Sequence, residues 1–177
     1  GHGPAFGDGT SDYPLCRSSR SSQNSEQAKR SIIMVVVENL GTLEVRLQHQ
    51  GKSVLPNLAR IIDDGIFFHN VQTSGIRSSH AFPPIFAGLP AQASNILWQV
   101  PIRNVDGFPA ALRASGYKTI YRHGAELVME QKRSFLQLVG FEEIIEPTES
   151  DRFSTHGWGY SDADMFQAIR SDIQEFR

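Results

Sequence analysis

Two side chains far apart in the sequence could together form a reactive site. Glu38 directly follows an unbroken apolar run that ends in Val37, and Ser78 lies in a loop rich in Gly and Ser. A carboxylate at the end of a buried segment is costly unless it is paired or binds a cation. A hydroxyl beside such a cation can become a nucleophile at neutral pH. Each residue also allows a simpler interpretation, in which Glu38 is a solvated strand end and Ser78 a turn residue.

The composition is that of one globular domain with a sizeable core. Of the 177 residues, 40% are hydrophobic and 20% are charged, and the net charge is −2. This near-neutral balance gives no reason to propose a nucleic acid as partner. No apolar run approaches the roughly 20 residues of a membrane helix. Cys16 is the only cysteine, which excludes an internal disulfide framework and a cysteine-rich zinc site.

Hydrophobic periodicity predicts alternating strands and helices after a polar arm. Residues 1–31 show no hydrophobic period and are interpreted as a flexible arm or linker, and residues 32–177 as one domain. Apolar runs and alternation predict strands at residues 32–37, 66–73, 118–124 and 142–147. Helical spacing of apolar residues predicts helices at residues 53–66, 105–117, 132–141 and 161–176.

This alternation predicts an α/β fold with a mainly parallel sheet. Ligands bind such sheets at the carboxyl ends of the strands. Glu38, the loop of Ser78 and His123 each directly follow a predicted strand. We therefore expect three polar groups that are distant in sequence to meet at one edge of the sheet.

The order of several short motifs resembles the amino-terminal part of the sulfatase and alkaline phosphatase superfamily. Its members carry an apolar strand ending in an acid, a PNL helix, a G-(I/V)-x-F-x-N strand, a nucleophile loop and a TGLP-like helix end. The corresponding residues here are Glu38, Pro56-Asn57-Leu58, Gly65 to Asn70, Ser78 and Gly88-Leu89-Pro90. The resemblance covers roughly residues 31–176. It implies an alkaline phosphatase-like three-layer sandwich with helices on both faces of the sheet, of which this chain is the amino-terminal half.

Within the superfamily, the chain looks most like the lipoteichoic acid synthase and phosphoglycerol transferase branch. That branch has Glu after the first strand and a basic residue before a Ser or Thr nucleophile, as in Arg77-Ser78. The stretch YRHGAELVMEQKRSFLQLVGFEEI is similar to the branch's HG segment, which supplies a substrate-binding histidine, here His123. By spacing, Lys132 stands where the branch has an arginine.

The resemblance implies a metal-dependent phosphotransferase or hydrolase that acts on phosphoesters or sulfoesters. Glu38 and Ser78 would ligate a divalent cation (Mn, Mg, Zn or Ca), and the Ser78 alkoxide would attack the phosphorus. Arg77 would balance charge beside the phosphoryl oxygens, because spread negative charge in such transition states is stabilised by a metal and positioned donors. Substrate contacts are expected from three further basic residues, His80, His123 and Lys132.

Sulfatases proper convert a Cys or Ser in the pattern C/S-x-P-x-R to formylglycine. Aligned on the Gly-Leu-Pro helix end, that residue is Ser78, and His80 and Phe82 stand at the Pro and Arg positions. We therefore expect no aldehyde at Ser78 and no arylsulfatase chemistry. A sulfatase that uses an unmodified serine stays an alternative.

The catalytic domain of the family is about twice as long as this chain, and its remaining metal ligands lie in the carboxyl-terminal half. Hard cations prefer roughly six oxygen ligands, so we expect the chain alone to be inactive and to bind metal weakly. An alternative from another class is a non-catalytic pseudoenzyme or binding fragment. The resemblance also implies a small-molecule or lipid-linked substrate, and a parent protein anchored to a membrane on the periplasmic side or the cell surface.

A Pro-Pro pair follows the loop of Ser78. Pro83 and Pro84 remove backbone donors, so the helix after Ser78 is expected to begin late, near Pro83, or to kink.

Overall fold

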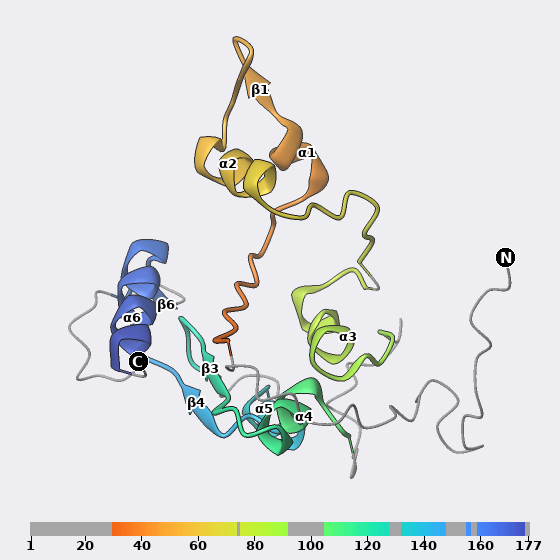
Figure 1. Ribbon diagram of the computed structural model, residues 1–177, viewed down its shortest axis with the longest axis vertical. Helices are drawn as coiled ribbons and strands as arrows, with labels where there is room; N and C mark the ends of the chain where they lie inside the picture. Colours follow the sequence, from red (N-terminus) through yellow and green to blue (C-terminus); the bar gives the residue numbers. More distant parts are fainter. Residues whose placement is uncertain are drawn as a thin grey trace, which may run out of the picture. The chain divides into compact units, whose positions relative to one another are not determined.

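The structure of the chain is a computed structural model (Figure 1). It describes residues 30–73, 75–91, 105–127, 132–147, 155–156 and 159–175. All but the last two residues of the predicted arm at 1–31 lie outside the described residues, so its flexibility stays a prediction.

Backbone contacts divide the chain into two compact units, Gly1–Val37 and Glu38–Arg177. The described part of the first unit, residues 30–37, forms neither a helix nor a strand. The side chains of residues 32–37 are between 54% and 61% exposed. The prediction of a doubly buried strand there is therefore wrong. An apolar run becomes a strand only when neighbouring strands bond its backbone, and among the described residues no strand pairs with it.

The second unit begins with a short helix, a hairpin and a longer helix. These elements are α1 (Thr42–Arg46), the antiparallel strands β1 (Gln48–His49) and β2 (Lys52–Ser53), and α2 (Pro56–Asp64). Pro56 lies in the first turn of α2 and Gly65 is its C-cap, so the helix predicted at 53–66 is confirmed with a later start. The sequence analysis missed α1 and the hairpin, because neither has a clear hydrophobic period.

The strand predicted at 66–73 is also wrong. The described residues of this stretch form neither a helix nor a strand. Ile66, Phe68 and Val71 are each more than 70% exposed. Alternating apolar residues indicate a face that can be buried, but the pairing of the backbone has to come from elsewhere in the fold.

A 3-10 turn and a short helix follow, η1 (Ser78–His80) and α3 (Phe82–Ala87). Pro83 lies in the first turn of α3, where the missing N–H leaves no partner unsatisfied. This confirms the expected late start. Gly88 ends the helix with φ of 65°, a left-handed conformation that favours glycine.

Strands β3 (Ile120–Arg122) and β4 (Glu143–Ile145) form a parallel pair, and they lie side by side in Figure 1. Helix α4 (Phe108–Ala114) precedes β3, and α5 (Lys132–Leu138) lies between the two strands in the sequence. All four elements were predicted and are confirmed. Gly140 ends α5 with φ of 103°, and a Cβ there would lie 2.7 Å from the Ala110 backbone, so this stop requires glycine.

The hydrophobic core lies among α3, α5 and the loops beside them. Its buried members are Phe86, Leu127, Phe135, Leu136 and Val139. Aromatic rings pack on it edge to face, since the Phe86 ring centroid lies 5.3 Å from that of Phe141 and 5.9 Å from that of Tyr121. Tyr121 belongs to β3, so the core fixes this strand.

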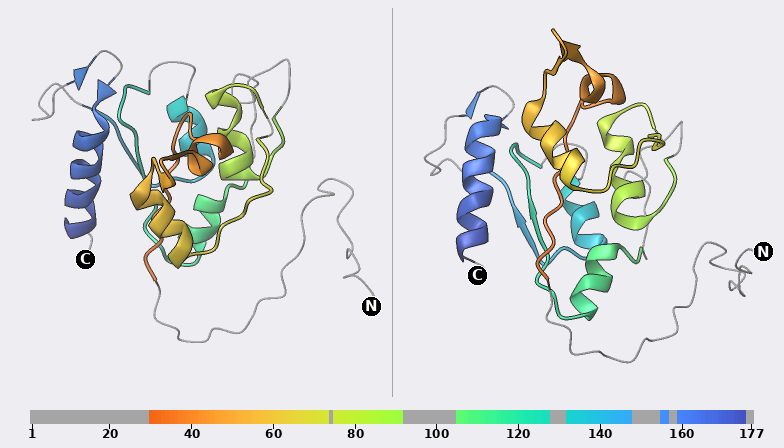
Figure 2. Two further views of the ribbon diagram at one scale, coloured as in Figure 1. Left: turned by 90° about the horizontal axis from the view of Figure 1, so that it is seen from above. Right: turned by 45° about the horizontal axis from the view of Figure 1, so that its top comes forward.

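The last described elements are the hairpin β5 (Thr155–His156) and β6 (Gly159–Tyr160), followed by α6 (Asp162–Glu175). In Figure 2, α6 is the long blue helix. The Ser161 hydroxyl accepts a hydrogen bond of 3.2 Å from the Asp164 N–H and so caps the helix. In the part of the chain that the structure describes, no helix is both long and apolar enough to cross a membrane.

Candidate functional site

The two residues on which the sequence argument depends do meet. The Ser78 hydroxyl donates a hydrogen bond of 2.5 Å to Glu38 Oε1, across forty positions of the chain. Both side chains are exposed. Glu38 is the first residue of a turn, and Asn39 takes a left-handed φ of 57°. The geometry therefore pairs a hydroxyl with a carboxylate oxygen at an accessible surface. The roles of nucleophile and metal ligand stay predictions.

The stretch from residue 75 to 81, here called the nucleophile segment, presents Ser78. Its backbone turns through two local hydrogen bonds, from His80 N–H to Arg77 O at 2.9 Å and from Ala81 N–H to Ser78 O at 3.0 Å. Gly75 packs directly on the His80 side chain, since a Cβ at residue 75 would lie 2.2 Å from His80 Cβ. Glycine is therefore required for this close approach.

The neighbours of Ser78 differ in exposure. Arg77 is exposed, whereas Ser79 and His80 are 7% and 6% exposed. The expectation that His80 contacts a substrate stays a prediction. Arg77 lies next to Ser78 at the surface, where a charge-balancing role needs it.

His123 directly follows β3 in what we call the histidine segment, residues 119–127. Its backbone N–H donates to Ile145 O at 2.9 Å, which extends the β3–β4 pairing by one bond. The ring Nδ1 lies 3.0 Å from the Ala125 N–H donor and 2.9 Å from Ala125 O. The ring also stacks on Tyr121, with centroids 6.1 Å apart. The strand, its partner and the loop together fix the orientation of the imidazole.

The surroundings of His123 act on its pKa in both directions. Burial lowers the pKa of His123, and the hydrogen bond to the Ala125 backbone raises it. Smaller effects on the same pKa come from Lys132, which lowers it, and from Glu146 and Glu38, which raise it. Of the three groups expected to meet at one edge of the sheet, Glu38 and the loop of Ser78 are in contact, and the approach of His123 to them stays a prediction.

The donors at Ser78 suit a hard divalent cation in kind but not in number. A carboxylate and a hydroxyl are the oxygen ligands that Mg²⁺, Mn²⁺ and Ca²⁺ prefer. Within the described residues, however, no group of three or more His, Cys, Asp or Glu side chains could hold a metal ion. Glu38 and Ser78 could therefore hold such a cation only together with further ligands.

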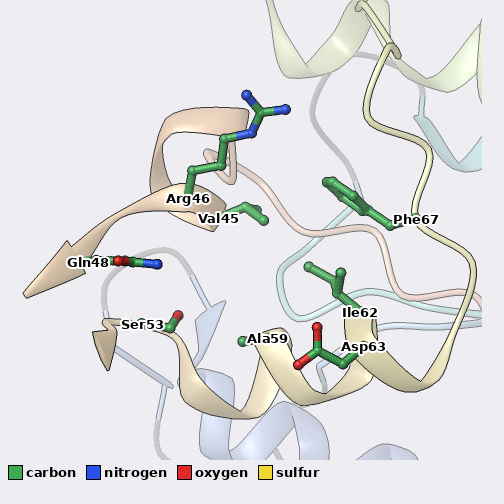
Figure 3. A pocket seen from close by; sticks show the side chains of 8 residues that line it. All are labelled: Val45, Arg46, Gln48, Ser53, Ala59, Ile62, Asp63 and Phe67. Carbon is green, nitrogen blue, oxygen red and sulfur yellow. The ribbon is translucent and has the colours of Figure 1, made fainter. Parts of the chain in front are cut away.

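A separate pocket of about 320 Å³ lies between α1, the β1–β2 hairpin and α2 (Figure 3). Figure 3 shows Val45, Ile62 and Phe67 directed toward the same space. Neither Glu38 nor Ser78 lines it. The candidate chemistry therefore lies outside this pocket, on an exposed surface.

The structure adds one residue that the sequence analysis did not single out. Glu146 directly follows β4 and accepts a hydrogen bond of 2.7 Å from the Leu127 N–H. Its other oxygen pairs with the Arg133 guanidinium. The backbone bond, more than the arginine, lowers the pKa of Glu146, although burial opposes the shift. An acid after an apolar strand was the signal used for Glu38, and it applies equally to Glu146.

The fold is that of a known class of proteins. The chain is similar to the crystal structure of a protein in the alkaline phosphatase superfamily from Vibrio parahaemolyticus, with a TM-score of 0.62 and 22% sequence identity. The match covers 71% of this chain and 32% of that protein, so the chain spans about a third of its length. The predicted α/β fold of alkaline phosphatase type, present in part, is confirmed.

The family follows from the sequence. The sulfatase family model matches residues 30–175, which is most of the chain. The chain therefore belongs to the sulfatase family, and the resemblance to the sulfatase and alkaline phosphatase superfamily is confirmed.

Proposed function

We propose that the chain forms part of a metal-dependent phosphotransferase or hydrolase that acts on phosphoester or sulfoester substrates through Ser78. The observation that carries this proposal is the hydrogen bond from Ser78 to Glu38. A long-range bond between an exposed hydroxyl and an exposed carboxylate adds little to stability. It does, however, hold the hydroxyl in one orientation, which a nucleophile needs.

In the proposed reaction, Ser78 Oγ forms a bond to the phosphorus of the substrate while the bond from phosphorus to the leaving alcohol breaks. The hydroxyl proton passes to solvent, and the leaving alkoxide takes up a proton. Water or an acceptor alcohol then attacks the phosphoserine ester and restores the hydroxyl. A divalent cation held partly by Glu38 and Ser78 would supply positive charge that lowers the pKa of the hydroxyl.

The other residues have supporting roles in this proposal. Arg77, exposed beside Ser78, balances charge on the phosphoryl oxygens. His123 and Lys132, which interact electrostatically, bind the anionic part of the substrate. His80 supports the nucleophile segment from beneath, because its ring is buried against Gly75.

The substrate class follows from the branch that the sequence resembles. We propose a lipid-linked or small phosphoester of the kind that lipoteichoic acid synthases and phosphoglycerol transferases use. This chemistry takes place outside the cytoplasm, so the parent protein would lie at the cell surface or in the periplasm, attached to a membrane. The membership of the sulfatase family supports a second candidate, hydrolysis of a sulfate ester by the unmodified serine.

Kinetics of the complete gene product test the proposal. With a chromogenic phosphodiester and Mn²⁺, Ser78→Ala should lower kcat/KM at least about 1,000-fold, because removal of a nucleophile leaves only binding and electrostatic effects. Ser171→Ala is the matched control, since this exposed serine donates only to Gln167 O in its own helix. Equal turnover by Ser78→Ala and the wild type would refute the nucleophile.

A chromogenic sulfate ester in the same assay separates the two candidates. Turnover of the phosphodiester alone supports the phosphotransferase, and turnover of the sulfate ester alone supports the sulfatase. Turnover of neither substrate by the wild-type protein favours a non-catalytic binding fragment.

A further inference from the structure

The loop that follows β3, residues 123–127 of the histidine segment, is fixed at its beginning by backbone bonds. His123 N–H donates to Ile145 O, and Gly124 O accepts a bond of 2.7 Å from the Tyr160 N–H. A Cβ at Gly159 would lie 2.0 Å from Gly124 O, so the β5–β6 hairpin approaches this loop as closely as the backbone allows. These contacts determine where the segment leaves β3.

A single side chain fixes the end of the segment. Glu146 Oε2 accepts the Leu127 N–H at 2.7 Å, and Glu146 Oε1 pairs with Arg133 on α5. The Leu127 side chain is only 1% exposed and belongs to the core. One carboxylate thus joins the loop to α5 and to the end of β4. A carboxylate with both oxygens engaged has a defined orientation.

Between these two ends lies Ala125, whose backbone contacts the ring of His123. Nδ1 lies 3.0 Å from the Ala125 N–H and 2.9 Å from Ala125 O, so the ring orientation depends on the path of the loop. The tautomer of the ring decides which of these two contacts is the hydrogen bond. Any shift of residues 125–127 would therefore turn the ring or release Nδ1.

We propose that Glu146 is a positioning residue for His123, which it orients through the Leu127 N–H, and that the ion pair of Glu146 with Arg133 is not needed for this role. The proposal rests on the proposed function in so far as His123 binds the anionic group of the substrate. It differs from a purely structural ion pair in one respect. The orientation of His123 depends mainly on the Glu146 oxygen that accepts the Leu127 N–H, and less on the charge of the Glu146 carboxylate.

Three variants separate the two bonds of Glu146. Glu146→Gln removes the charge but keeps an oxygen for the Leu127 N–H, and Arg133→Gln removes the ion pair and leaves the Leu127 bond. Glu146→Ala removes both bonds. If Glu146→Ala does not fold, Glu146→Asp replaces it, because its shorter side chain keeps the charge but cannot hold both partners at the present positions.

The first readout is spectroscopic and needs no activity. In the 177-residue chain labelled with ¹⁵N-histidine, the shifts of Nδ1 and Nε2 report the tautomer and the bond to Ala125. We expect a native pattern in Glu146→Gln and Arg133→Gln and a changed His123 pattern in Glu146→Ala or Glu146→Asp. An unchanged pattern in the folded Glu146→Ala or Glu146→Asp chain would overturn the proposal. So would an Arg133→Gln spectrum as altered as that of Glu146→Ala.

The second readout is the kinetics of the complete gene product. Glu146→Ala should raise KM for the phosphodiester about tenfold with a smaller change in kcat, which corresponds to about 1.4 kcal/mol of lost substrate binding. Glu146→Gln should restore KM to within about threefold of the wild type. A change in kcat alone would contradict the assignment. If the wild type itself turns over no substrate, the proposed function fails, and the spectra still decide the role of Glu146.

Discussion

The nucleophile segment and the histidine segment bring their key side chains into place in different ways. Ser78 is exposed, its turn is held by local backbone bonds, and its side chain reaches a distant partner, Glu38. His123 directly follows a strand of a parallel pair, is partly buried, and has bonded backbone neighbours on both sides. The first arrangement leaves a hydroxyl accessible to a substrate. The arrangement in the histidine segment fixes the orientation of a ring, and the core contributes to the stability of that segment.

The largest expected effect comes from one substitution, Leu to Ala, made at a buried position of the histidine segment and at an exposed position outside both segments. Leu127→Ala removes a fully buried side chain from the histidine segment and should lower the free energy of unfolding by about 2–5 kcal/mol. Leu43→Ala, at a side chain that is 82% exposed on α1, should change it by less than about 0.5 kcal/mol. Urea unfolding followed by circular dichroism measures both. Equal losses would show that the core does not lie where the structure places it.

A glycine in each segment gives a second, smaller test. Gly75→Ala places a methyl group 2.2 Å from His80 Cβ and should cost about 1–3 kcal/mol. Gly124→Ala meets Met165 Sδ at an ordinary 3.6 Å and should be tolerated. Thermal unfolding of the two variants compares them directly. If Gly75→Ala were as stable as Gly124→Ala, the packing of the nucleophile segment on His80 would be wrong.

The dependence of the free energy of unfolding on pH should distinguish the two segments through the pKa of His123. The pKa of His123 in the folded chain is below its ordinary value of 6.5, so the unfolded chain takes up a proton first as the pH falls. The neutral ring therefore contributes stability that is complete above about 6.5 and is lost as the pH falls toward the folded pKa. His123→Gln should remove this part of the pH dependence in a series of urea titrations.

The contribution of Glu146 to the stability of the fold is also lost toward acid, but in a separate pH range. Its pKa is lowered from 4.5, so its contribution is present above that value and decreases only at lower pH.

The groups that act on the pKa of His123 besides burial and Ala125 are Lys132, Glu146 and Glu38. If His123→Gln left the stability between pH 5 and 6.5 unchanged relative to the wild type, the partial burial of the ring would be refuted.

The sequence predicted the elements whose own residues supply both period and stop signals. Helices α2, α4, α5 and α6 have apolar faces and are bounded by Pro, Gly or Ser, and all were found. The strands β3 and β4 were found for the same reason. The apolar stretches 32–37 and 66–73 satisfy the strand pattern equally well, yet neither forms a strand. Whether such a stretch becomes a strand depends on a neighbour, and its own residues cannot show whether that neighbour is present.

The candidate site could be predicted in outline because its residues follow apolar runs. That rule identified Glu38 and His123, and the ordered motifs pointed to Ser78. The rule could not indicate which side chains of a loop are buried, so it gave no sign that His80, which was expected to contact the substrate, is only 6% exposed. Nor could it reveal the contact between Glu146 and Leu127, because a bond to a backbone N–H leaves no trace in residue type.

The most direct test of the account is the identity of the residue that becomes phosphorylated. The complete gene product is mixed with a phosphodiester and a divalent cation, quenched in acid during turnover, digested and analysed by mass spectrometry. The account predicts that the phosphorus of the substrate, with the one alcohol group that it retains, is ester-linked to Ser78 in the peptide that contains this serine, and that no such adduct forms in the Ser78→Ala protein. An adduct on another residue, or undiminished turnover with Ser78 replaced, would contradict it.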